Sequence, residues 1–344
     1  MKNFKTTWIL PVLVGGALVV PTVTSWGVDI YVRAETTSLT LPDGKTVLMW
    51  GFIRDNDNNF ATLETTAGYG FQGRTIVDVP SGNGGNTLRI FLTNRLAVPT
   101  SIVIPGQNGY VADLPHATFT DGQNRTRAQS FVKETAPGAV GLYQWTNTSL
   151  GTYLLYSGSH VAVQVQMGLY GPVTRSVGGN EPYPGTNINS ARQATLLFGE
   201  IDPDVHDAIQ AGNYGPTPVD PTKQMTSTSG SRPRYFLING RGYPQTTQIN
   251  LGGNRTDPMM LRLLNASLDA HVPVVNGPPV NVIAEDGTLY TYPRPQSAVF
   301  LPALKTMDVV LTVASGARLP IYDRRLGLVN GTQSPGGMLV YLQN

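Results

Sequence analysis

Short apolar runs with a period of two, separated by turn residues, recur along the chain and limit its fold to β-structure. Leu88, Ile90 and Leu92 fall on one face of an extended strand. Residues 151–156 and 161–166 alternate in the same way, which predicts two more strands. The segments between such runs are rich in glycine and proline, which number 38 and 26 in 344 residues. This pattern predicts an all-β protein built from Greek-key sandwiches or barrels.

Other runs predict the remaining elements. Further strands are expected at residues 101–104, 195–199, 234–239, 258–264, 280–283 and 306–312. Residues 37–41 and 46–50 flank a Pro-Asp-Gly turn and predict a hairpin. A single helix is predicted over residues 204–211, with Asp204 as its N-cap.

Charge and cysteine content exclude several classes of protein. Lysine and arginine number 24 and aspartate and glutamate 22, so the net charge of +2 gives no reason to expect a nucleic-acid partner. Cysteine is absent, which excludes disulfide scaffolds, thiolate nucleophiles and copper centres with a cysteine ligand. The four histidines, His116, His160, His206 and His271, lie too far apart in the sequence to form a local metal-binding motif.

The N-terminal residues 1–25 are typical of a signal peptide. Two lysines precede an apolar run of about 16 residues, short of the roughly 20 that span a bilayer. A retained membrane anchor is the alternative interpretation. We expect an exported protein, periplasmic or extracellular, with no membrane association once the signal has been removed.

An internal repeat indicates two related domains. Residues 87–104 and 258–275 share an order, in which an apolar strand ends at an asparagine and a proline-containing return follows. The two copies are too far apart for a solenoid repeat. A segment rich in glycine, proline and asparagine at 176–190 predicts a linker. The expected domains are therefore 26–175 and 191–344.

Four stretches resemble multicopper oxidases. LTNRLAVPTSIVIPGQ (92–107) and GTYLLYSGSHVAVQVQMGLYGPV (151–173) are similar to the two copper-site segments of that family's first domain. YFLINGRGY (235–243) and MMLRLLNAS (259–267) are similar to parts of its second domain. The resemblance covers roughly residues 35–344. It implies two tandem plastocyanin-like (cupredoxin) domains, each a Greek-key β-sandwich.

The positions of the family's copper ligands differ here. Its histidines in the two segments fall on Val103 and Pro105, and on Tyr156 and Gly158. Valine, proline and glycine have no side-chain donor, and a phenol has a pKa near 10. The sequence also has no counterpart of the family's third domain, which holds the blue-copper cysteine. The resemblance therefore implies a degenerate copper site, with no copper cofactor and no catalytic residue.

The histidines are weak site candidates. His160 is a residual candidate for metal binding, but a single imidazole makes a poor metal site. His271 follows Asp269 by two residues, and that carboxylate could orient its ring, although we expect a packing or surface role. His116 and His206 are expected to be isolated.

Three hypotheses for function follow. The leading one is an exported, copper-free relative of multicopper oxidases that acts as a structural or binding protein, with homo-oligomers formed through its edge strands. The second is a subunit of a copper-dependent oxidase that a copper-bearing partner protein completes. The third is an enzyme of different chemistry on the same fold, for which no set of residues is visible. The sequence favours a non-catalytic protein and leaves the ligand open.

Overall fold

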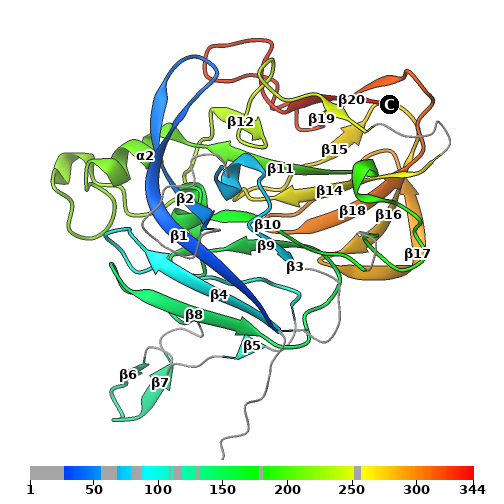
Figure 1. Ribbon diagram of the computed structural model, residues 1–344. Helices are drawn as coiled ribbons and strands as arrows, with labels where there is room; N and C mark the ends of the chain where they lie inside the picture. Colours follow the sequence, from blue (N-terminus) through cyan, green and yellow to red (C-terminus); the bar gives the residue numbers. More distant parts are fainter. Residues whose placement is uncertain are drawn as a thin grey trace, which may run out of the picture.

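The structure is a computed structural model that describes residues 27–55, 68–79, 87–107, 110–111, 118–128, 132–177, 181–251 and 257–344. Two pairs of β-sheets make up most of it, one pair from each half of the chain (Figure 1). The predicted all-β fold is therefore confirmed. The predicted signal peptide lies outside the described residues. Within those residues, no helix has the length and apolar character needed to cross a membrane.

The N-terminal half forms a five-stranded sheet and a three-stranded sheet. The first has the order β2-β1-β4-β8-β5 and the second the order β3-β10-β9. In β4 and β8, buried and partly exposed residues alternate, because one face of each strand covers the core. A small ribbon, β6–β7, projects at the lower left of Figure 1. The strands are β1 (Gly27–Thr40), β2 (Thr46–Asp55), β3 (Val77–Val79), β4 (Thr87–Asn94), β5 (Tyr110–Val111), β6 (Thr118–Thr120), β7 (Thr126–Ala128), β8 (Val140–Trp145), β9 (Gly151–Tyr156) and β10 (Tyr170–Arg175).

The C-terminal half forms a six-stranded sheet and a four-stranded sheet. Their orders are β12-β11-β14-β18-β16-β17 and β13-β20-β19-β15. The strands are β11 (Gln193–Ile201), β12 (Tyr235–Ile238), β13 (Ile249–Asn250), β14 (Met259–Asn265), β15 (Pro273–Val275), β16 (Val280–Glu285), β17 (Thr288–Gln296), β18 (Thr306–Leu311), β19 (Arg318–Asp323) and β20 (Leu339–Gln343).

The two halves repeat one strand topology. In the first half β1 runs parallel to β4, and β4 is antiparallel to β8. In the second half β11 runs parallel to β14, and β14 is antiparallel to β18. The smaller sheets also match, because β10 and β20 each pair with one parallel and one antiparallel neighbour. The repeat seen in the sequence therefore has a structural counterpart, while the domain bounds 26–175 and 191–344 stay a prediction.

The two repeated asparagines have the same role. Asn94 ends β4 and Asn265 ends β14, and both are fully buried. Each side-chain oxygen accepts a hydrogen bond from the backbone N–H two residues on, at 2.9 Å for Asn94 and 2.8 Å for Asn265. Each amide nitrogen donates to the carbonyl four residues on, at 2.8 Å in both cases. The amide therefore fixes the turn that leaves each of these two strands.

Each half has its own core, and a third cluster joins them. The first core includes Val32, Ile90 and Tyr143, and the second includes Phe198 and Leu263. The joining cluster takes its buried side chains from both halves: Leu39, Leu41, Val47, Met49, Phe71, Leu154, Val165, Tyr170, Leu197, Ile201, Tyr235, Leu237, Leu264 and Ala266. The burial of this apolar surface stabilises the contact between the halves.

The predicted strand at 161–166 is wrong, because these residues form helix α1 (Val161–Gln166). The amides of Val163 and Gln164 donate to the carbonyl of His160, both at 2.9 Å, which starts the helix. The glutamines that gave the period-two pattern are buried, and Gln164 donates to the carbonyl of Pro99 at 2.8 Å. The polar residues therefore did not mark an exposed face.

Other local predictions are confirmed in part. The hairpin before residue 50 is confirmed as β1 and β2. The predicted strand at 101–104 is wrong, because Val103 forms an isolated bridge with Tyr156 and the segment forms no strand. The predicted helix is α2 (Pro203–Gln210), and its N-cap is Asp202, whose side chain accepts from the Asp204 amide at 3.0 Å. Proline at the first helical position favours this earlier start. In the predicted linker, Tyr183 is buried and donates to Asp308 at 2.5 Å.

Strand β17 forms one edge of the six-stranded sheet and lies at the right of Figure 1. Most of its residues are exposed, and Tyr292 is 82% exposed. Its pairing with β16 places Pro295 opposite Asn281 and Arg294 opposite Val282.

Candidate functional site

The four positions that the resemblance assigned to copper ligands come together around one cavity. The backbone amide of Val103 donates to the carbonyl of Tyr156 at 2.9 Å, and the Tyr156 amide donates back to Val103 at 3.1 Å. This bridge joins the segment after β4 to the end of β9. Pro105 and Gly158 lie two residues further along each segment, and all four residues line a cavity of about 350 Å³.

The walls of this cavity are mainly apolar. The other lining residues are Ile102, Ile104, Gln107, Val132, Trp145 and Val161. The Gln107 amide is occupied, since it donates to the carbonyl of Ser149 at 3.1 Å and accepts from its N–H at 2.8 Å. A Cβ on Gly158 would lie 2.9 Å from the Val103 and Val132 methyl groups. The packing therefore has no room for a larger side chain, such as imidazole, at position 158.

The lining residues do not fit copper. Tyr156 carries the one oxygen donor among the four positions, and burial raises the pKa of its hydroxyl, with the charge of Asp286 adding to the effect. A neutral phenol is a weak copper ligand, and copper sites need several converging nitrogen or sulfur donors. Among the described residues, no imidazole, thiolate or carboxylate lines the cavity. In the described part of the chain, no group of three or more histidine, cysteine or acidic residues is placed to hold a metal.

Comparison with known proteins places the fold. No family model and no curated protein matches the chain. Among solved structures, it is similar to a blue copper oxidase from Nitrosomonas europaea, with a TM-score of 0.68, 17% identity, and coverage of 92% of this chain and 86% of that one. The multicopper oxidase mgLAC gives a TM-score of 0.66 at 16% identity, with the same coverage. The fold is that of the multicopper oxidases.

The same fold occurs in a copper nitrite reductase from Nitrosomonas europaea. That structure has a TM-score of 0.60 and 14% identity, and the alignment covers 92% of this chain and 93% of the reductase. Copper proteins of nearly this length therefore carry the multicopper-oxidase fold. A third domain is not a requirement of the fold. That this chain has lost copper ligands stays a prediction, which the chemistry of the cavity supports.

His160 does not face the cavity of the four positions. It precedes α1 with a left-handed backbone (φ 41°) and is exposed. It lines a separate cavity of about 520 Å³, whose other lining residues include Trp50, Glu134 and Tyr214. His160 and Gly158 therefore line different cavities, although they are only two residues apart.

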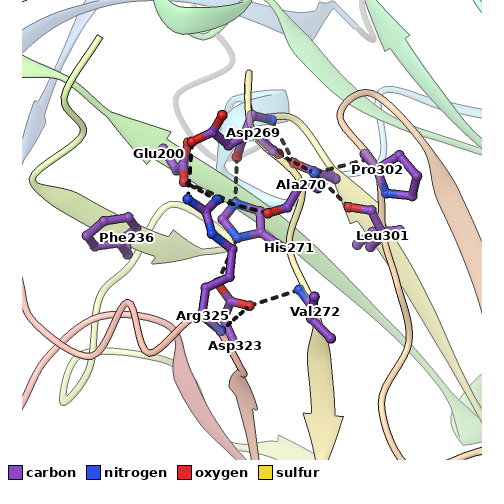
Figure 2. A network of polar contacts seen from close by, with 12 residues as sticks. Glu200, Phe236, Asp269, Ala270, His271, Val272, Leu301, Pro302, Asp323 and Arg325 are labelled. Atoms are coloured by element: carbon purple, nitrogen blue, oxygen red, sulfur yellow. Dashed lines mark hydrogen bonds and ion pairs between the residues drawn. The ribbon is translucent and has the colours of Figure 1, made fainter. Parts of the chain in front are cut away.

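His271 has a different acidic partner from the one expected. Its Nδ1 lies 2.8 Å from Asp323, and its Nε2 lies 3.0 Å from the Ser267 hydroxyl and 3.5 Å from Glu200 (Figure 2). Asp269 instead pairs with Arg325 at 3.2 Å. The less favoured alternative, in which Asp269 orients the His271 ring, is therefore not what the structure shows, whereas the expected packing role agrees with a ring that is fully buried.

Ser267, His271 and Asp323 make the contacts of a serine–histidine–aspartate triad, which the sequence did not reveal. Their exposed fractions are 2%, 0% and 1%, so no substrate can reach the hydroxyl. Burial alone would raise the pKa of Asp323, but the hydrogen bonds from His271 and from the Val272 N–H outweigh it and hold that pKa below its usual value. Burial raises the pKa of Glu200, and the charge of His271 opposes this. The cluster is a buried structural network.

His206 is also structural. It lies on α2, is fully buried, and its Nδ1 and Nε2 lie 2.6 Å and 3.0 Å from the carbonyls of Leu48 and Gln166. Burial lowers the pKa of its ring. The histidine thus fastens α2 to the N-terminal half. His116 lies outside the described residues.

Proposed function

We propose that this chain is an exported, non-catalytic binding protein, in which the cavity beside Val103 and Tyr156 takes a small apolar molecule in place of copper. The observation that carries the proposal is the mainly apolar lining at the four positions where the resemblance places the copper ligands of the family. A cavity of about 350 Å³ falls in the size range of small-molecule pockets.

The chemistry of the walls defines the ligand class. Burial of apolar ligand surface contributes about 25 cal/mol per Å², so a ligand that covers the apolar walls is favoured. Because Trp145 lies among these walls with Ile102 and Val161, we expect the ligand to contain an aromatic ring. The Tyr156 hydroxyl has no hydrogen-bond partner among the described residues, and it stays protonated because its pKa is raised. A one- or two-ring aromatic compound with a single hydroxyl group would satisfy both features.

The binding role is supported over catalysis by the absence of a reactive group at this cavity. The described residues that line it include no histidine or carboxylate, which could act as a general base. The same absence argues against an oxidase subunit completed by a copper-bearing partner, because the described residues of this cavity would supply no copper ligand to a shared site. The signal-like N-terminus supports a periplasmic or extracellular location.

Titration of the mature protein with 2-naphthol, followed by tryptophan fluorescence, tests the proposal. We expect saturable quenching, because Trp145 lines the cavity. Val161→Phe would fill the cavity and weaken binding by about tenfold or more. Val219→Phe is the matched control, since Val219 is 80% exposed and lies outside the cavity. Equal affinity in both variants would overturn the assignment of this cavity.

Metal analysis tests the copper part of the proposal. After incubation with copper and removal of the excess, mass spectrometry should find well under one copper per chain. One or more tightly bound copper ions would show that the ligand assignment is wrong. Co-purification with a copper-bearing partner would favour the oxidase-subunit hypothesis instead.

A further inference from the structure

A second, larger cavity lies between the two halves of the chain. Its volume is about 790 Å³, and it shares no lining residue with the apolar cavity. Three segments form it: the end of β1 and the turn after it, the short turn that follows Gly70, and the loop after β12. The lining residues are Ser38, Leu39, Thr40, Pro42, Gln72, Gly73, Arg74, Asn239, Gly240, Arg241, Gly242, Gln245 and Thr247. We call this cavity the polar cleft.

The charge of the polar cleft is one-sided. Arg74 and Arg241 line it, and none of the described residues that line it is acidic. Within the described residues neither guanidinium has an ion-pair partner, and Arg241 makes one long contact, at 3.5 Å, with Thr247. Asp43, the acidic residue next to the lining residue Pro42, is occupied by the Tyr235 hydroxyl at 2.6 Å. Two guanidinium groups are therefore free to bind an anion.

The uncharged groups of the polar cleft suit a ligand with many hydroxyls. Ser38, Thr40 and Gln245 have side chains with no hydrogen-bond partner in the described part of the chain. Leu39 and Pro42 add a small apolar surface, against which the C–H face of a sugar ring could pack. An isolated phosphate or carboxylate ion would leave most of the 790 Å³ to water.

The floor of the polar cleft is held in place by close backbone packing. Gly73 has a left-handed backbone (φ 75°), and a Cβ there would overlap the side chain of Asn239. The Asn239 amide is fixed in turn, since it accepts from the Leu197 N–H at 2.9 Å and donates to the Thr195 carbonyl at 2.9 Å. The loop that carries Arg241 is therefore anchored to β11, and the cleft is largely pre-formed.

We propose that the polar cleft binds an anionic oligosaccharide, a hydroxyl-rich chain that carries carboxylate or sulfate groups. Guanidinium groups bind these groups through paired, charge-assisted hydrogen bonds. The hydroxyl and amide side chains pair with sugar hydroxyls. The site is independent of the binding function proposed for the apolar cavity, because the two cavities share no residue.

Isothermal titration calorimetry on the mature protein, at low salt, tests this inference with three probes: trigalacturonate, its fully methyl-esterified form, and a sulfated disaccharide. We expect binding of one or both anionic probes, no binding of the neutral ester, and weaker binding at higher salt. Carboxylate and sulfate sources are distinguished by which probe binds more tightly.

Three arginine variants complete the test. Arg74→Gln and Arg241→Gln should each weaken binding by about tenfold or more. Arg294→Gln is the matched control, because Arg294 is exposed on β17, outside the polar cleft. All three positions are exposed, so we expect unchanged thermal unfolding in each variant. Failure of both anionic probes to bind, or equal loss in the Arg294 variant, would overturn the inference.

Discussion

Replacement of the buried amide at the end of β14 gives a sharp test of how the fold is held together. Asn265 is fully buried. Its nitrogen donates to the carbonyls of Asp269 at 2.8 Å, Leu301 at 3.0 Å and Pro302 at 3.1 Å, and its oxygen accepts from the Ser267 N–H at 2.8 Å. Asn265→Ala removes all of these bonds and leaves the backbone partners without the side chain.

The size of the effect follows from these contacts. A buried hydrogen bond contributes about 1 kcal/mol net, and each buried group left without a partner costs about 1–3 kcal/mol. Because water can reach some of the freed carbonyls, we expect Asn265→Ala to lower the free energy of unfolding by about 3–5 kcal/mol. Asn94→Ala should lose a similar amount, since its amide makes the equivalent bonds.

The isosteric variant Asn265→Asp separates hydrogen bonding from packing. The variant keeps the shape of the side chain, but a carboxylate oxygen replaces the amide nitrogen that donates to the three carbonyls, so two acceptors face each other. At pH 7 it should destabilise the protein at least as much as Asn265→Ala.

Equilibrium unfolding in urea, followed by tryptophan fluorescence and circular dichroism, measures these changes. Asn281→Ala is the control, because Asn281 is exposed on β16 and its variant should differ by less than about 0.5 kcal/mol. A loss below about 1 kcal/mol for Asn265→Ala would refute the role assigned to the amide.

Three further predictions concern a buried carboxylate, a left-handed glycine and a buried serine. Burial raises the pKa of Glu200, so its charged form opposes folding, and the stability of the protein falls as pH rises through that pKa. In thermal melts Glu200→Gln should therefore be more stable than wild type at pH 7. The difference should shrink below about pH 4, where the carboxyl group is protonated in both states. Gly73→Ala should lower the free energy of unfolding by about 2–4 kcal/mol, because φ is 75° and the methyl group would overlap Asn239. Gly138 is the control, since its φ is 73° and a methyl group there would have no neighbour within 4 Å. Gly138→Ala should lower the free energy of unfolding by only about 1 kcal/mol. Ser267 should resist a fluorophosphonate probe in the folded protein, and labelling above that of Ser267→Ala would contradict its burial as the reason for inertness.

The sequence predicts the strands and their repetition well, because local patterns encode both. The alternation of Leu88, Ile90 and Leu92 corresponds to the buried face of β4. The asparagine that closes this run recurs at the end of β14, and the structure gives both the same hydrogen bonds. α1 was missed because Gln164 and Gln166 are buried, so polarity there does not indicate exposure.

The sites are harder to predict, because they combine distant segments. Val103 and Tyr156 could be paired only through the family resemblance, since no local signal links them. Asp323 lies far along the chain from His271, and the nearer Asp269 was the natural but incorrect choice of partner. The polar cleft takes residues from both halves, and its unpaired arginines are visible only once the chain has folded.

The prolines of β17 have a consequence for how copies of this protein meet at high concentration. Pro295 pairs with Asn281 across the ladder, Pro293 lies two residues earlier, and neither proline has a backbone N–H to donate to another strand. A strand from a second copy that approached this edge would find two donors missing, and Arg294 stands between them. The exposed margin of the C-terminal sheet is thus a poor template for fibre growth.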